Sequence, residues 1–180
     1  MRYTKLVKKI LKEMSAPWPD FSENDSYLNA AKVPENSNLI QTISLSGEKF
    51  QVFEYRYKNN TASIYVVDGN KKMRLTIRFG INSQDNSIRT TTVQKHSDSK
   101  FYYSDFIKKV LLTRYSYMLS DDSHTKASFG LYKRLASDPE VDLSVVDINT
   151  GKTIPVDNGE ELEQYYGEGL EHFIYKVSLR

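Results

Sequence analysis

The sequence predicts an α+β protein with a mixed, mainly antiparallel sheet, in which a five-strand meander precedes an α-β-α-β-β series with flanking helices. Hydrophobic residues alternate with a period of two through residues 39–94, as in strands with one buried face. Helical spacing returns in two later stretches that alternate with apolar runs. No Pro- or Gly-rich linker divides the 180 residues, so we expect residues 1–180 to form a single domain.

The N-terminal segment predicts a basic amphipathic helix over residues 3–14, because its apolar residues recur along one face. The prolines on either side of Trp18 must end this helix, since proline removes a backbone donor. Residues 1–38 are therefore expected to be this helix and an irregular segment, packed on or appended to residues 39–180, with a helical turn around residues 27–31. The basic residues of the helix are Lys5, Lys8, Lys9 and Lys12.

The meander is predicted from alternation and from the turns that separate its strands. Ser46-Gly47, Asn59-Asn60 and Asp68-Gly69-Asn70 are residue types that tolerate positive φ, which tight turns require. The alternation predicts an antiparallel arrangement with one buried face. The expected strands are residues 39–45, 48–58, 61–67, 71–81 and 88–94.

Helices alternate with strands in the second half. Ser104 is expected to cap the first helix, because a serine hydroxyl can accept from the free N–H groups of the first turn. The stretch 157–171 carries six acidic residues and no basic one, and it includes Tyr165 and Tyr166. The expected helices are residues 104–114 and 124–136, and the expected strands are residues 115–119, 141–147 and 172–179.

Composition excludes several classes of function. The chain has no cysteine, which excludes disulfides, thiolate catalysis and cysteine-ligated metals. No apolar run approaches the roughly 20 residues that span a bilayer, and no apolar stretch follows the basic N-terminus as in a secretory signal. The net charge of +2 is close to balance. We therefore expect a cytoplasmic protein that does not bind a membrane.

Catalytic motifs are equally scarce. His96, His124 and His172 lack the spacing of metal ligands and are expected to be surface or loop residues, so no metal is predicted. The phosphate-binding, dinucleotide-binding and nucleophile-elbow patterns GxxxxGK[ST], GxGxxG and GxSxG do not occur.

One segment carries a resemblance. The helix expected after residue 124 contains Ala127, Leu131, Tyr132 and Leu135 at the spacing A-x-x-x-L-Y-x-x-L, between two strands. This resembles the C-terminal half of the GCN5-related N-acetyltransferases, whose fold also has a meander followed by a crossover helix. The resemblance implies that Tyr132 would be the catalytic acid that protonates the coenzyme A thiolate. It also implies that the cofactor phosphates would lie near Ser97, Ser99 and Ser104.

The same region departs from the family pattern. The family holds the cofactor pyrophosphate with a glycine-containing turn at a helix N-terminus, whereas residues 83–104 contain no glycine. Asp105 at the start of the expected helix would also repel phosphate. The resemblance therefore predicts a catalytically degenerate, acetyltransferase-like fold that does not need acetyl-coenzyme A.

Three functions are predicted in order of preference. The first is protein binding by an accessory protein of a phage or mobile element, either host-modulating in the host cytoplasm or virion-associated. Its setting is inferred from the richness in Lys, Ser, Asn and Tyr that an AT-rich genome gives. The second is an acyl-coenzyme A-dependent N-acyltransferase with Tyr132 as general acid. For the first function, protein binding, the expected interaction surface combines Lys5, Lys8, Lys9 and Lys12 with Glu160, Glu161, Glu163, Tyr165 and Tyr166.

The third prediction is a nucleic-acid binder. Arginines interleave with tyrosines along the meander, and a shared exposed face of this kind binds single strands by stacking and charge. The residues concerned are Arg56, Arg74, Arg78 and Arg89 with Tyr55, Tyr57 and Tyr65.

Overall fold

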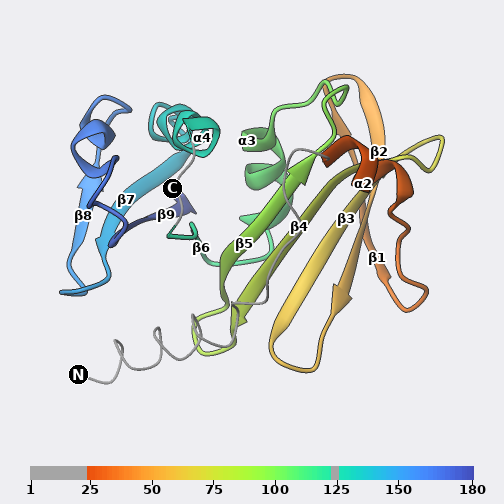
Figure 1. Ribbon diagram of the computed structural model, residues 1–180, viewed down its shortest axis with the longest axis horizontal. Coiled ribbons are helices and arrows are strands. Elements are labelled where there is room, and N and C mark those ends of the chain that lie inside the picture. Colours follow the sequence, from red (N-terminus) through yellow and green to blue (C-terminus); the bar gives the residue numbers. More distant parts are fainter. Residues whose placement is uncertain (1–23, 123–125) are drawn as a thin grey trace.

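The computed structural model describes residues 24–122 and 126–180 and is built on one nine-stranded sheet (Figure 1). The strand order is β1-β2-β3-β4-β5-β6-β9-β7-β8. Every neighbouring pair is antiparallel except β5 and β6, which are parallel. The α+β class with a mixed, mainly antiparallel sheet is therefore confirmed.

The first five strands form the predicted meander. Tight turns join them, and residues with positive φ occupy these turns, as at Ser46-Gly47 and Asn60. The third turn differs from the expectation, because Lys71 and not Gly69 takes the positive φ. There the Asp68 carboxylate accepts the backbone N–H groups of residues 70 and 72. The strands are β1 (Asn38–Leu45), β2 (Glu48–Arg56), β3 (Thr61–Asp68), β4 (Met73–Asn82) and β5 (Ser87–Lys95).

The crossover from β5 to β6 is shorter than predicted. It consists of α3 (Tyr103–Phe106) and a π-helical segment η2 (Ile107–Leu111), and β6 is only Met118–Leu119. Ser104 is not the N-cap: Tyr102 occupies that position without a side-chain cap, and Ser104 lies buried in the first turn. The predicted strand 115–119 is shortened because the backbone N–H groups of Arg114 and Tyr115 donate back to the Leu111 carbonyl, which continues the turn after η2.

In the described residues after β6, the chain adds one α-helix, one 3-10 helix and three strands, of which β8 was not predicted. β8 has four residues and contains a proline, so it lacks the alternation that identifies a strand. β9 lies between β6 and β7, and α2 belongs to the N-terminal part. The remaining elements are α2 (Asn24–Ala30), α4 (Lys126–Ala136), β7 (Val141–Asp147), β8 (Thr153–Val156), the 3-10 helix η3 (Glu161–Tyr165) and β9 (Phe173–Leu179).

Apolar side chains pack on both faces of the N-terminal strands. On one face, α3 and η2 cover a large core, which continues to α4 over β7, and α3 and α4 lie beside each other (Figure 1). On the other face, Leu28 of α2 packs against Val67 and Met73 in a smaller cluster. The helical turn predicted near residues 27–31 is thus α2.

Some predicted features lie outside the described residues. These are the helix at residues 3–14 with Lys5, Lys8, Lys9 and Lys12, and also His124. Within the described ranges, no helix is both long and apolar enough to cross a membrane.

Candidate functional site

Tyr132 lies where the two parallel strands meet. β5 and β6 pair through only two residue pairs, Ile88 with Met118 and Arg89 with Leu119. β5 continues beyond this pairing to Lys95, whereas β6 ends at Leu119. The side chain of Tyr132 on α4 reaches this junction, so the fold brings α4, β5 and β6 together at one hydroxyl group.

The Tyr132 hydroxyl is enclosed by protein. The residue is 4% exposed, and its ring packs 4.7 Å from the Tyr175 ring, centroid to centroid. Burial raises the pKa of Tyr132 well above the usual tyrosine value, and the Asp121 charge acts in the same direction. Hydrogen bonding with the side chains of Thr90 and Ser120 acts in the opposite direction.

The two partner hydroxyls are themselves tied to the backbone of the junction. Thr90 Oγ1 donates to the carbonyl of Leu119 at 3.3 Å. Ser120 Oγ donates to the carbonyl of Asp121 at 2.8 Å and accepts the N–H of Tyr175 at 2.9 Å. The Tyr132 hydroxyl therefore belongs to a small polar network that joins β5, β6 and β9. We name Thr90, Ser120 and Tyr132 the Tyr132 network.

Two further polar groups lie beside this network. The Tyr103 hydroxyl of α3 is buried and has no hydrogen-bond partner among the described residues. Burial raises its pKa well above the ordinary value, with smaller contributions from Tyr132 and Asp121. Arg89 Nη2 lies 3.8 Å from the Asp122 carboxylate, and burial lowers the pKa of this guanidinium.

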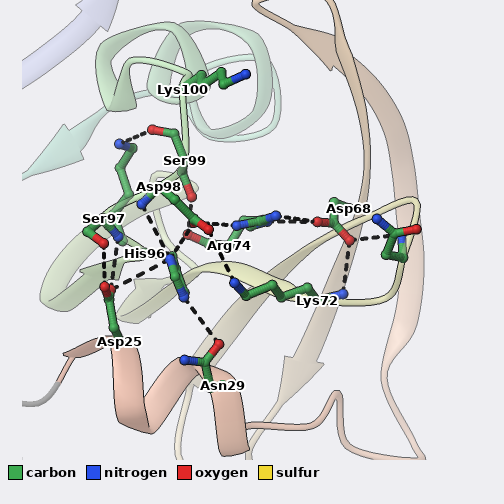
Figure 2. Close-up of polar contacts among 12 residues, drawn as sticks. Asp25, Asn29, Asp68, Lys72, Arg74, His96, Ser97, Asp98, Ser99 and Lys100 are labelled. Atoms are coloured by element: carbon green, nitrogen blue, oxygen red, sulfur yellow. Dashed lines mark hydrogen bonds and ion pairs between the residues drawn. The ribbon is translucent and has the colours of Figure 1, made fainter.

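Ser97 and Ser99 lie elsewhere, in the loop after β5 (Figure 2). Both the N–H and the hydroxyl of Ser97 donate to the Asp25 carboxylate of α2, and these hydrogen bonds lower the pKa of Asp25. Ser99 Oγ donates to the Arg74 carbonyl at 3.2 Å, and its own carbonyl accepts from Lys95 Nζ at 2.7 Å. Ser104 is on α3, so the three serines do not share one place.

A row of charged side chains connects this loop to the turn between β3 and β4 (Figure 2). Arg74 lies between two carboxylates, with Nη2 2.7 Å from Asp68 and Nη1 on Asp98. The hydrogen bond from Arg74 is the main cause that lowers the pKa of Asp98 to about 2, and a hydrogen bond from Lys72 adds to it.

His96 corrects the expectation of a surface histidine. It is 4% exposed, because Nε2 lies 3.2 Å from Asn29 Oδ1 of α2 while Nδ1 faces the carboxylates of Asp98 and Asp25. No sequence pattern predicts this, since α2 and β5 are about 70 residues apart. Within residues 24–122 and 126–180, no group of three or more His, Asp and Glu side chains could hold a metal ion.

The acidic segment 157–171 is held on α4. Tyr166 stacks on Phe129 at 4.1 Å, and Glu163 forms an ion pair with Lys133 at 2.7 Å. Tyr165 packs against Phe173 with ring centroids 5.1 Å apart. The side chain of Glu161 accepts from Asp157 and Asn158, and Glu160 is exposed.

The four arginines of the proposed nucleic-acid face have different surroundings. Arg56 pairs with the buried Glu54, and Arg74 and Arg89 lie beside aspartates. Arg78 lies over the ring of Tyr57 at 5.0 Å, and the Tyr55 and Tyr57 rings meet edge to face at 4.8 Å.

No protein-family model and no curated protein matches this sequence. Among solved structures, the chain is similar to one described as "Crystal structure of Nourseothricin acetyltransferase". That alignment covers 89% of this chain and 95% of that chain, with 6% sequence identity and a TM-score of 0.36. The likeness is a weak one of fold.

Proposed function

We propose that this protein acts by binding another protein, on an acetyltransferase-like fold that has lost acyl transfer. The observation that carries the proposal is the Tyr132 hydroxyl, which is buried and hydrogen-bonded with Thr90 and Ser120. A general acid must reach the atom that it protonates. A hydroxyl that joins three strands of its own sheet serves packing instead.

The surroundings of Ser97 and Ser99 support the same proposal. Both serine hydroxyls already donate within the protein, and the Asp25 carboxylate of α2 accepts both the N–H and the hydroxyl of Ser97. A pyrophosphate placed there would have to displace this carboxylate, because the Ser97 N–H group is not free. We therefore propose that no acyl-coenzyme A cofactor is used.

The acidic segment 157–171 is the surface that we propose for the partner. Asp157, Glu160, Glu163 and Glu168 are exposed, and the stacking of Tyr166 on Phe129 holds the segment in place. Exposed carboxylates on a supported segment attract a basic partner over long range. Lys5, Lys8, Lys9 and Lys12 form the second, basic part of the proposed surface.

The proposed setting is the accessory protein of a phage or other mobile element, host-modulating or virion-associated. It rests on composition, in particular on 13 tyrosines in 180 residues.

Thermal unfolding with and without millimolar acetyl-coenzyme A tests the loss of acyl transfer. We expect no change in Tm. A ligand at about 100 times its Kd would stabilise the native state by about 2.7 kcal/mol and raise Tm by roughly 2–4 °C. Tyr132→Phe should lower stability by about 1 kcal/mol, since it removes hydrogen bonds to Thr90 and Ser120.

The runner-up is an N-acyltransferase, and one observation favours it. The Tyr103 hydroxyl, buried beside Tyr132, has no partner in the described part of the chain. A buried hydroxyl of this kind gains from a bound ligand. A rise in Tm with acetyl-coenzyme A, together with acyl transfer that Tyr132→Phe abolishes, would establish this function and overturn the first.

A further inference from the structure

The two edges of the sheet differ in their protection. β8 at one edge has four residues, and its Pro155 cannot donate a hydrogen bond to a further strand. β1 at the other edge has eight residues, with neither a proline nor a charged side chain. Edge strands are normally shortened, charged or interrupted, because their unpaired N–H and C=O groups invite another strand. By this measure β8 is protected and β1 is open.

The second half of β1 is ready for pairing. A bulge lies between Leu39 and Gln41, and from Gln41 to Leu45 the register with β2 is regular. Ile43 and Leu45 are buried in the core, and Gln41 Nε2 donates to the Lys109 carbonyl at 3.3 Å. These contacts hold the strand from one side. Within the described residues, β2 is the only strand that pairs with it.

We propose that a second copy of this chain pairs with β1, so that residues 41–45 of the two copies form an antiparallel pair across a two-fold axis. The pairing satisfies the backbone groups of both open edges and continues the sheet from one subunit into the next. It is independent of the proposed partner of segment 157–171, which lies toward the opposite edge.

The side chains of β1 favour its own copy as the occupant. A register centred on Ile43 places Thr42 opposite Ser44 of the partner subunit, and hydroxyl pairs of this kind are favourable across strands. Both residues are exposed and small. Because the strand is uncharged, pairing with itself brings no like charges together. Glu48 and Lys49, which pair with Leu45 and Ser44, are on β2, one strand further in.

Disulfide trapping tests the register directly, because the chain has no cysteine of its own. The double variant T42C/S44C should give a covalent dimer under mild oxidation, since the thiol introduced at position 42 would face the thiol at position 44 of the other copy. Within one chain the two positions are roughly 6.6 Å apart along the strand, beyond the usual Cβ separation of a disulfide.

The variant K49C/Q51C is the matched control. Lys49 and Gln51 are the exposed residues of β2 that pair with Ser44 and Thr42. In the proposed dimer, the β2 strands are three strand spacings apart, roughly 14 Å, so these introduced thiols should not cross-link.

Sedimentation of the full-length chain over a range of concentrations provides the second measurement. With increasing protein concentration, the average molecular mass in solution should rise from 20.8 kDa, the mass of one chain, to twice that value. T42K/S44K places lysines opposite each other and should weaken the dimer by about tenfold or more. Gln51→Lys adds a lysine to the exposed side of β2, one strand away from the interface, and should leave the dimer unchanged.

Three outcomes overturn the proposal. The first is a monomer at every concentration with no cross-link in T42C/S44C. The second is a dimer that T42K/S44K leaves intact. The third is dimerisation through β1 only after deletion of residues 1–23. That result would mean that these residues cover the edge in the full-length chain. None of these depends on acetyl-coenzyme A, so the two proposals fail separately.

Discussion

Asp98 ties the loop after β5 to the sheet through its ion pairs with Arg74 and Lys72. Its pKa is lowered to about 2, mainly by the hydrogen bond from Arg74. An unfolded aspartate titrates near pH 3.9, so the unfolded state takes up the proton first as the pH falls. The stability contributed by this carboxylate is therefore fully present above about pH 4 and is lost toward about pH 2.

In Asp98→Asn, the free energy of unfolding should consequently fall less between about pH 4 and pH 2 than in the wild type. The reason is that the variant has no carboxylate to protonate at this position. Urea unfolding at a series of pH values measures this slope. Asp142→Asn, an exposed carboxylate paired with Arg180 near the other edge of the sheet, is the control. Equal slopes for the wild type and Asp98→Asn would contradict the assignment.

The sequence predicts Tyr132 as a residue of interest but not its surroundings. The motif around Tyr132 is local, so it can be read from the spacing of Ala127, Leu131 and Leu135. Thr90 and Ser120 join it only because β5 and β6 pair in parallel, which no local pattern specifies. For the same reason, the burial of His96 under α2 could not be predicted.

At the scale of elements, the meander was predicted within about two residues at each end. Its signals are local, since alternation and tight turns act between neighbouring residues. The crossover was predicted poorly. Apolar spacing indicated one helix over residues 104–114, but the backbone widens into the π-helical segment η2, so Phe106, Ile107, Val110 and Leu111 remain buried in a different geometry.

Substitution of glycine by alanine should have opposite effects at Gly130, which is in α4, and at Gly159, which packs on α4. A Cβ at Gly130 would meet nothing within 4 Å, so Gly130→Ala should stabilise the helix by about 0.5–1 kcal/mol. A Cβ at Gly159 would lie 2.9 Å from the Lys133 carbonyl oxygen, so Gly159→Ala should destabilise by about 1–3 kcal/mol. Chemical denaturation measures both values. Effects of the same sign would contradict the close packing of Gly159 on α4.

At the scale of the whole molecule, β6 is the narrow connection between two larger groups of strands. It has two residues, which pair with β5 on one side and with β9 on the other. The strands β1–β5 and β7–β9 are longer and pair extensively within each group. We therefore expect native-state hydrogen exchange to resolve two cooperative units.

Met118→Ala should weaken the connection between these units. Met118 is fully buried and pairs with Ile88 and Val177, so its truncation should cost about 2–5 kcal/mol and increase exchange in β9. Met73→Ala, in the smaller cluster under α2, is the matched control and should increase exchange near α2 instead. One opening free energy shared by all nine strands would contradict the two-unit description.

The strand order explains why the class of the fold could be predicted while its topology could not. The consecutive hairpins of residues 38–95 follow from turns that the sequence contains. The position of β9 between β6 and β7 depends on contacts such as Val177 with Met118 and Leu143, which are distant in sequence.

The interior position of β9 has a consequence for synthesis of the chain. As the polypeptide emerges from its N-terminus, β1–β5 can pair in order, because each strand meets its neighbour at once. β6 and β7 are translated earlier than β9 but do not pair with each other, so the β7–β8 hairpin stays separate from the rest of the sheet until residues 173–179 enter between β6 and β7. Chains truncated after residue 172 should therefore protect the first five strands from protease while leaving β7 and β8 open to cleavage.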